Sequence, residues 1–266
     1  MRTKSSGGET IGTRNDKAGQ SGQILLSLVF AEGSRPDSDC LIDLAAKIGR
    51  MNDEPGTGFT VSHRPISAEG WLEFLAMGLT FDCRGLSPAV PMPLPPKGQL
   101  LGLTHPVFGE AIGLAPGPHL EAGGPLMPVI RVLCALAATL ATLPGVLAVC
   151  WGPAKSWMAP DYFIRAITGW QAGGAFPALG LATLKRESNG ALSSHGLDFL
   201  IGQELRFEPD SSLPLPAATR IAVRLIHQMA EGGAIDSATD LTGPDGEALV
   251  AVPVRDGRQL RVMRRR

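Results

Sequence analysis

The sequence predicts an α+β fold of two lobes, each with a mixed or antiparallel sheet and helices packed on one face. Short apolar runs typical of strands are mixed with segments of helical periodicity, without the long uniform alternation of a doubly wound fold. The 33 glycines and 22 prolines among 266 residues indicate many turns between short elements. A proline-rich segment, "SPAVPMPLPPKGQ", separates two runs of elements. We therefore expect lobes at residues 23–98 and 99–266, preceded by a disordered leader at residues 1–22.

The first lobe is predicted to follow the order β-α-β-β. Its opening run, "QILLSLVF", is apolar and has the length of a strand. "SDCLIDLAAKIGRM" is predicted as a helix, because its apolar residues between positions 41 and 48 recur at helical spacing and one of residues 37–39 can cap it. "GFTVSHRP" and "LEFLAMGLTFDC" are predicted as strands. The proline-rich segment then closes the lobe without regular structure.

The second lobe is predicted to contain three helices and six strand segments. Helices are expected at residues 127–143, 160–171 and 217–231; the first is ended by Pro144 and Gly145, and the last carries an apolar stripe. The sequence from Asp256 to Gly257 predicts a hairpin turn near the carboxyl end. The expected strands, in chain order, are "QLLGLTH", "GVLAVCW", "FPALGLATLKRE", "ELRFEP", "EALVAVPV" and "QLRVMR".

Charge and hydropathy patterns favour a protein that stays in the cytoplasm. Lys and Arg total 24 against 25 for Asp and Glu, so no global positive field attracts nucleic acid. The leader has basic residues but lacks the apolar core of an export signal. The longest apolar stretch, residues 125–151, contains Arg131 and is cut by Pro144, so we expect a helix and a strand there rather than insertion into a membrane.

Three segments carry a family resemblance: "LPGVLAVCWGPAKSWMAPDYF", "FPALGLATLKRE" and "HGLDFLIGQELRFEP". With these segments, residues 127–261 resemble the bacterial domain of unknown function numbered 4261. The matching positions are the strand Gly145–Trp151, Phe163, Phe176–Pro177, Gly196–Leu197 and Gly202–Leu205. His195 departs from the pattern, because the family favours a small hydroxylated residue there, and "FPALGLATL" lacks a Trp. The resemblance implies an interaction or immunity role near toxin and secretion systems, and it implies no particular reaction.

The stretch "SSHGLDFLIGQELRFEP" allows two interpretations. Ser194, His195 and Asp198 lie close enough in sequence for a turn to assemble a nucleophile, a base and an orienting acid. A small hydrolase that uses Ser194 and His195 with Asp198 or Glu204 is therefore the alternative function. However, a glycine-flanked nucleophile turn of the Gly-x-Ser-x-Gly type is missing. The structural interpretation is that Gly196 and Gly202 permit a tight turn, after which apolar and charged residues alternate along a half-exposed strand. We favour the structural interpretation.

Metal and cofactor motifs do not stand out. The five histidines lack the paired spacing or cysteine partners of a local zinc signature; His105, Glu110 and His119 form the tightest set, in a segment predicted as a surface loop. The glycines at 243 and 246 lack the Lys-Ser or Lys-Thr of a phosphate-binding loop. We therefore predict no metal site and no cofactor.

The tryptophans suggest a binding surface instead. Trp151 is expected in the core, whereas Trp157, between Lys155 and Met158 and before Pro160, is expected to be exposed in a recognition loop. We predict a non-enzymatic scaffold or adaptor that binds another protein through Trp157, Lys155 and Met158, associated with a bacterial secretion, toxin or immunity system. Formation of a homo-oligomer stays open at this point.

Overall fold

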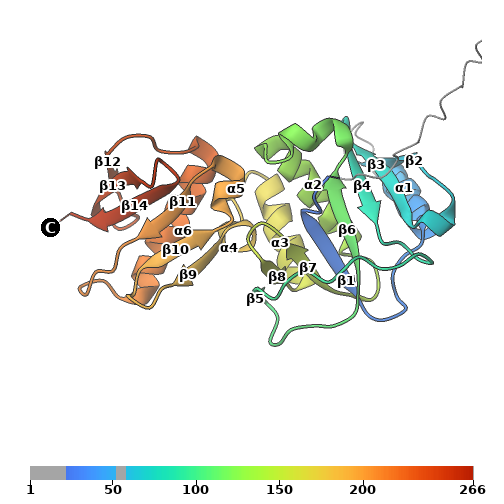
Figure 1. The fold of residues 1–266 in the computed structure, drawn as a ribbon, viewed down its shortest axis with the longest axis horizontal. Helices are drawn as coiled ribbons and strands as arrows, with labels where there is room; N and C mark the ends of the chain where they lie inside the picture. Colours follow the sequence, from blue (N-terminus) through green and yellow to red (C-terminus); the bar gives the residue numbers. More distant parts are fainter. Residues whose placement is uncertain (1–21, 52–57, 266) are drawn as a thin grey trace, which may run out of the picture.

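The computed structural model describes residues 22–51 and 58–265, and within them it shows an α+β fold with two mixed sheets (Figure 1). The first sheet has the spatial order β2-β3-β4-β6-β1-β7-β8-β5. Neighbouring strands are antiparallel except for β5 and β8, which run parallel. Its strands are β1 (Leu26–Phe30), β2 (Phe59–His63), β3 (Trp71–Ala76), β4 (Leu79–Arg84), β5 (Gln99–Leu101), β6 (Glu110–Pro116), β7 (Val146–Trp151) and β8 (Ser156–Met158).

The second sheet has the order β12-β13-β14-β11-β10-β9, with one parallel pair, β11 and β14. It occupies the orange and red half of the molecule in Figure 1. Its strands are β9 (Thr183–Arg186), β10 (Leu192–His195), β11 (Glu204–Phe207), β12 (Thr239–Thr242), β13 (Ala248–Val254) and β14 (Gln259–Arg264).

Helices cover one face of each sheet. In the first half, α1 (Ser38–Met51), α2 (Met127–Leu140) and α3 (Pro160–Gln171) share an apolar cluster with the side chains that β1 directs to that face, Leu26, Leu28 and Phe30. In the second half, α6 (Leu215–Gly232) packs on β10 and β11 through Ile221, Leu225 and Met229. The short helices α4 (Ala178–Leu181) and α5 (Leu197–Ile201) lie between the two sheets.

Several elements form where the sequence predicts them, with the expected chemistry at their ends. The Asp37 carboxylate accepts a hydrogen bond of 2.8 Å from the backbone N–H of Cys40 and so caps α1. Helix α2 ends at Leu140, before the predicted end at Leu143, and Gly145 with φ of 84° leads the chain into β7 as expected. The predicted hairpin turn at Asp256–Gly257 connects β13 to β14.

Several predictions about elements are wrong. "LEFLAMGLTFDC" forms two strands, β3 and β4, instead of one, β10 was not expected as a strand, and the helix α5 lies where a turn was expected. Residues 110–116, expected as a loop, form the central strand β6; residues 156–158, also expected as a loop, form β8; and β12 was not expected. "FPALGLATLKRE" is not a continuous strand, because Ala178–Leu181 is a helical turn and the strand begins at Thr183. Long-range pairing decides two of the missed strands, since β6 lies between β4 and β1 and β8 pairs with the distant strand β5.

The predicted lobe boundary at residues 98 and 99 does not coincide with the division between the sheets. Strands β5 to β8, which follow that boundary, join β1 to β4 in one sheet; the chain passes to the second sheet only after α4. The predicted leader, except for Gly22, lies outside the described residues.

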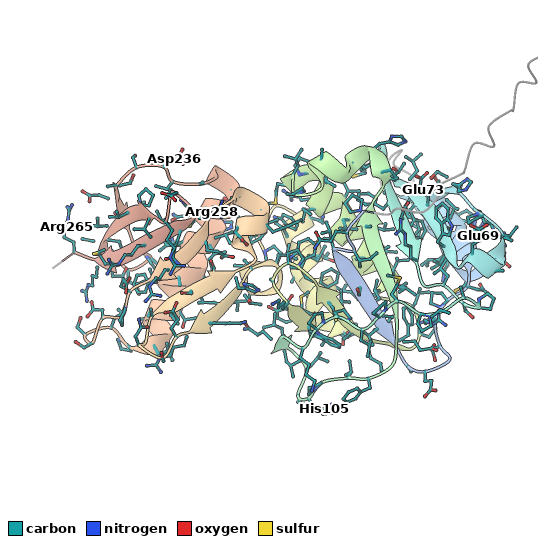
Figure 2. All side chains as sticks on the ribbon, viewed as in Figure 1. Glu69, Glu73, His105, Asp236, Arg258 and Arg265 are labelled. Carbon is teal, nitrogen blue, oxygen red and sulfur yellow. The ribbon has the colours of Figure 1, made fainter. Side chains whose placement is uncertain are left out.

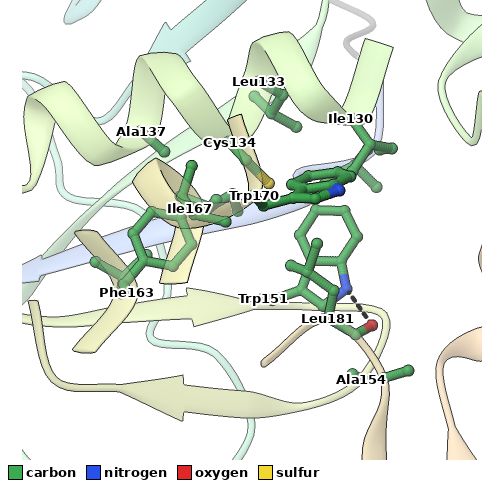
Figure 3. Packing of buried hydrophobic residues seen from close by; sticks show 14 of the residues in the cluster. Ile130, Leu133, Cys134, Ala137, Trp151, Ala154, Phe163, Ile167, Trp170 and Leu181 are labelled. Carbon is green, nitrogen blue, oxygen red and sulfur yellow. Dashed lines mark hydrogen bonds between the residues drawn. The ribbon is translucent and has the colours of Figure 1, made fainter. Parts of the chain in front are cut away.

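The two sheets share one apolar core. Trp151 is fully buried where they meet, its indole N–H donates a hydrogen bond of 3.0 Å to the carbonyl of Leu181, and its ring lies edge-on to Phe199 (Figure 3). Phe163, Ile167 and Trp170 of α3 pack between this tryptophan and α2. The burial of Trp151 confirms its predicted place in the core.

None of the described helices combines the length and the apolar character that crossing a membrane requires.

Candidate functional site

The stretch from Ser193 to Pro209 forms a turn bracketed by two glycines. Gly196 and Gly202 have φ of 91° and 75° and flank α5, so both have the left-handed backbone that the structural interpretation requires. A Cβ at Gly196 would lie 2.7 Å from the Cα of Ala154, in the loop between β7 and β8. Beyond the turn, Leu205 and Phe207 are buried while Arg206 between them is partly exposed. The turn therefore fixes the second sheet against the first.

Ser194 is not paired with His195. Its hydroxyl donates to the Glu204 carboxylate and accepts a hydrogen bond of 2.7 Å from the backbone N–H of Leu205. Ser194 and His195 are neighbours on β10, where successive side chains point to opposite faces. The His195 Nε2 atom is buried and has no hydrogen-bond partner among the described residues. Residues 194, 195 and 198 are therefore not brought together as a nucleophile, base and orienting acid.

In the hydrolase hypothesis, His195 would accept the hydrogen bond of the Ser194 hydroxyl. In the structure, the Glu204 carboxylate accepts it instead. Its carboxyl oxygens are held by the Ser194 hydroxyl and by the Gly196 N–H, at 2.6 Å. Burial, together with a hydrogen bond and a repulsive charge from Asp198, raises the pKa of Glu204 to about 7. For His195, burial and the charges of Lys185 and Lys155 lower the pKa. From the sequence, Glu204 is predicted only as a charged residue of the half-exposed strand and as an alternative to Asp198 in the hydrolase cluster; its contact with Ser194 depends on the pairing of β10 with β11.

A polar surface cavity of about 540 Å³ opens beside this cluster. It is lined by Glu204 and the turn between β13 and β14, with Arg255, Asp256, Arg258 and Gln259. Ser194 is not among the lining residues and is 7% exposed. A substrate in this cavity would meet the carboxyl of Glu204 and not the serine hydroxyl, so the alternative hydrolase lacks an accessible nucleophile here.

The predicted recognition loop is wrong for two of its three side chains. Trp157 and Met158 are 5% and 1% exposed and lie in strand β8. The Trp157 indole N–H donates a hydrogen bond of 3.0 Å to the carbonyl of Pro96, which draws the proline-rich segment across the sheet. Lys155 is exposed, in the turn before β8 with φ of 50°. A polar flank and a nearby proline predicted a loop, but pairing with β7 and β5 buries the tryptophan.

Trp157 nevertheless belongs to an apolar surface cavity of about 160 Å³. The cavity lies on the face of the first sheet opposite the helices, where Val29, Ala148 and Cys150 form a small cluster with Trp157. At its mouth Phe108 is 75% exposed and Leu94 is 39% exposed. The lining residues are Leu94, Pro95, Lys97, Gly98, Leu100, Pro106, Val107, Phe108 and Trp157. Figure 2 marks His105 in the loop below β5 that supplies residues 106–108.

Charged pairs occupy the outer face of the second sheet. Arg206 contacts the carboxylates of Glu187 and Glu208, and Glu208 also accepts from Arg261 at 2.6 Å. Ser193, predicted near a catalytic cluster, donates its hydroxyl to Glu187. Arg206, Arg261, Glu187 and Glu208 on this face thus satisfy one another's charges.

No metal centre emerges from the described part of the chain, where no three His, Cys, Asp or Glu side chains gather closely enough to hold an ion. Of the set considered from the sequence, Glu110 begins β6 and pairs with Arg35 at 3.0 Å, which with a hydrogen bond from Gly33 lowers its pKa. The Glu110 carboxylate thus forms an ion pair with Arg35 instead of a site with the two histidines considered from the sequence.

The chain matches no protein-family model, no curated protein and no solved structure.

Proposed function

We propose that this chain is a non-enzymatic scaffold or adaptor that binds another protein through the apolar cavity above Trp157. The single observation behind the proposal is that cavity, with Phe108 three-quarters exposed at its mouth (75%). Exposed apolar side chains grouped around a hollow mark interaction sites, and aromatic anchors dominate binding energies there. A volume of about 160 Å³ is below the roughly 300–1,000 Å³ of small-molecule sites, so a side chain fits better than a cofactor.

The setting of this binding is proposed from the resemblance of residues 127–261 to the domain family numbered 4261. On that basis the partner belongs to a bacterial secretion, toxin or immunity system, and the chain acts in the cytoplasm. The near balance of 24 basic and 25 acidic side chains supports a protein partner over nucleic acid.

The alternative, a small hydrolase, is less well supported. It would need Ser194 to lose the backbone N–H of Leu205 and His195 to turn to the other face of β10. Labelling with a serine-directed fluorophosphonate tests it directly: we expect Ser193 and Ser194 to stay unmodified. Stoichiometric labelling of Ser194 that is lost in His195→Ala would overturn the binding-protein assignment.

Affinity capture from the native cells tests the proposed function with a matched pair of variants. Phe108→Asp places a charge at the mouth of the cavity, whereas Val90→Asp places one in the proline-rich segment before β5, at a residue that is 83% exposed and does not line the cavity. We expect the wild type and Val90→Asp to retain the same stoichiometric protein, and Phe108→Asp to lose about 90% of it or more. Equal capture by all three proteins would contradict the proposal.

A further inference from the structure

Strand β5 has a free edge beside the apolar cavity. Among the described residues it is the last strand of the first sheet and pairs only with β8 (Figure 1). The backbone N–H of Gln99 donates to Lys155 and the carbonyl of Leu101 accepts from Ala159, at 2.9 and 2.8 Å. In a parallel pair the groups of the residue between these two point the other way. The N–H and the carbonyl of Leu100 therefore face the free edge.

The same residue lines the cavity with its side chain. Leu100 and Trp157 are cross-strand neighbours on the face opposite the helices, and both border the cavity. A backbone edge and an apolar hollow thus meet at one residue. An extended peptide bonded to the Leu100 backbone would pass the cavity mouth with its alternate side chains directed toward that face.

Two lysines give this edge a positive charge. Lys97 borders the cavity, and Lys155 lies beside the start of β5, bonded through its carbonyl to Gln99. All ion pairs in the described ranges, 22–51 and 58–265, use Arg or His as the cation, so neither lysine is matched by a carboxylate there. A lysine at the rim of an apolar hollow, with a second lysine beside the same strand and no acidic partner for either, favours a partner with acidic residues beside its apolar anchor.

Resting on the proposed function, we propose that the partner adds an extended acidic segment to β5, with one large apolar side chain in the cavity above Trp157. The Leu100 N–H and carbonyl supply the backbone pairing, Phe108 and Trp157 hold the anchor, and Lys97 and Lys155 attract the acidic neighbours. A single free N–H and carbonyl give little register specificity, so the apolar anchor and the charges select the partner.

Selection of peptides against the full chain tests this surface. The probe is a phage-displayed library of random dodecapeptides, with Phe108→Asp protein used for counter-selection. We expect selected peptides to share one large apolar residue flanked by Asp or Glu. A synthetic copy should bind Lys97→Glu about fivefold more weakly, while Lys47→Glu, on α1 and away from the cavity, leaves binding unchanged. Peptides without acidic residues, or equal binding by Lys97→Glu, would overturn the charge assignment.

Hydrogen exchange at the Leu100 amide separates strand addition from simple anchoring. With the selected peptide at saturation, we expect exchange at Leu100 to slow about tenfold or more, whereas the Leu101 amide, already directed at β8, changes little. Binding that depends on Phe108 but leaves Leu100 exchange unchanged would overturn strand addition while preserving the proposed function. If no peptide is enriched over Phe108→Asp, both the strand addition and the proposed function fail.

Discussion

The two sheets differ in how the face opposite their helices is covered. On the second sheet this face is open to solvent and carries paired charges, with Arg206 between Glu187 and Glu208. On the first sheet the corresponding face is apolar around Trp157 and is covered by the proline-rich segment and the loop after β5. Coil covers this apolar face incompletely and leaves the cavity bordered by Phe108.

The difference indicates which half of the molecule has unused binding capacity. Paired charges have little to gain from a new partner, because their hydrogen bonds would first have to be broken. A partly covered apolar hollow gains from every apolar atom placed in it. The comparison therefore assigns binding to the first sheet and a mainly structural role to the outer face of the second.

Truncation of Trp157 gives the largest expected effect. Trp157→Ala should lower the free energy of unfolding by about 3–5 kcal/mol, because a buried indole and its hydrogen bond to Pro96 are lost. Val252→Ala, on the open face of the second sheet, should cost about 1 kcal/mol or less. Urea denaturation of both variants makes the measurement. If Trp157→Ala is as stable as Val252→Ala, the two sheets do not differ in how much the covered face contributes to stability, and the comparison fails.

The junction of the two sheets is tested by a pair of glycines. Gly196→Val should destabilise the protein by about 2–4 kcal/mol, because φ is 91° and the new Cβ would meet Ala154 at under 3 Å. Gly202→Val has a similar φ of 75° but open space around its Cβ, so about 1–2 kcal/mol is expected. Thermal unfolding compares them. Equal losses of stability would show that backbone strain alone, and not the contact between the sheets, explains the effect of Gly196→Val.

Part of this fold could be predicted from the sequence, for a physical reason. Helix α6 was found because Ile221, Leu225 and Met229 repeat at helical spacing, and the last hairpin because Asp256–Gly257 is a strong local turn signal. These elements depend on residues close together in the chain. The fold class is confirmed for the same reason, since it needs only the number and kind of elements.

The rest depended on contacts between distant segments. Strand β6 contains Gly113 because the side chain of Ile24 lies where a Cβ would be, at 2.9 Å, and that glycine made the segment resemble a loop. The cavity combines residues 94–100, residues 106–108 and Trp157, so no local pattern could show it. Trp157 borders this cavity, but its side chain is buried and not exposed as the sequence predicted.

Titration of Glu204 should produce a smaller, pH-dependent effect in the second half. Its pKa in the folded protein, about 7, is above the ordinary value of 4.5, so its contribution to stability is complete below pH 4.5 and is lost as the pH rises through 7. Relative to Glu204→Gln, the wild type should lose on the order of 1 kcal/mol over this range, after allowance for solvent. Urea midpoints at several pH values measure it, with Glu32→Gln as an exposed control. A wild type that gains stability relative to Glu204→Gln as the pH rises from 4.5 through 7 would contradict the assigned shift.

The smallest expected effect lies in the charged face of the second sheet. Arg206→Gln removes the cation between two carboxylates that are still in contact with water, so about 1 kcal/mol or less is expected at low salt. The loss should shrink at about 1 M salt, where screening weakens the repulsion left between Glu187 and Glu208. Capture of the partner should be unaffected. A large loss of partner binding would move the binding face to the second sheet.

Site-specific photocrosslinking in living cells compares the two faces most directly. p-Benzoylphenylalanine replaces Phe108 at the cavity in one strain and Arg261, which is half exposed (50%) on the second sheet, in another. Irradiation followed by mass spectrometry should give one discrete protein adduct from position 108 and none from position 261. An adduct from position 261 alone, or none from either position, would contradict the assignment of protein binding to the cavity above Trp157.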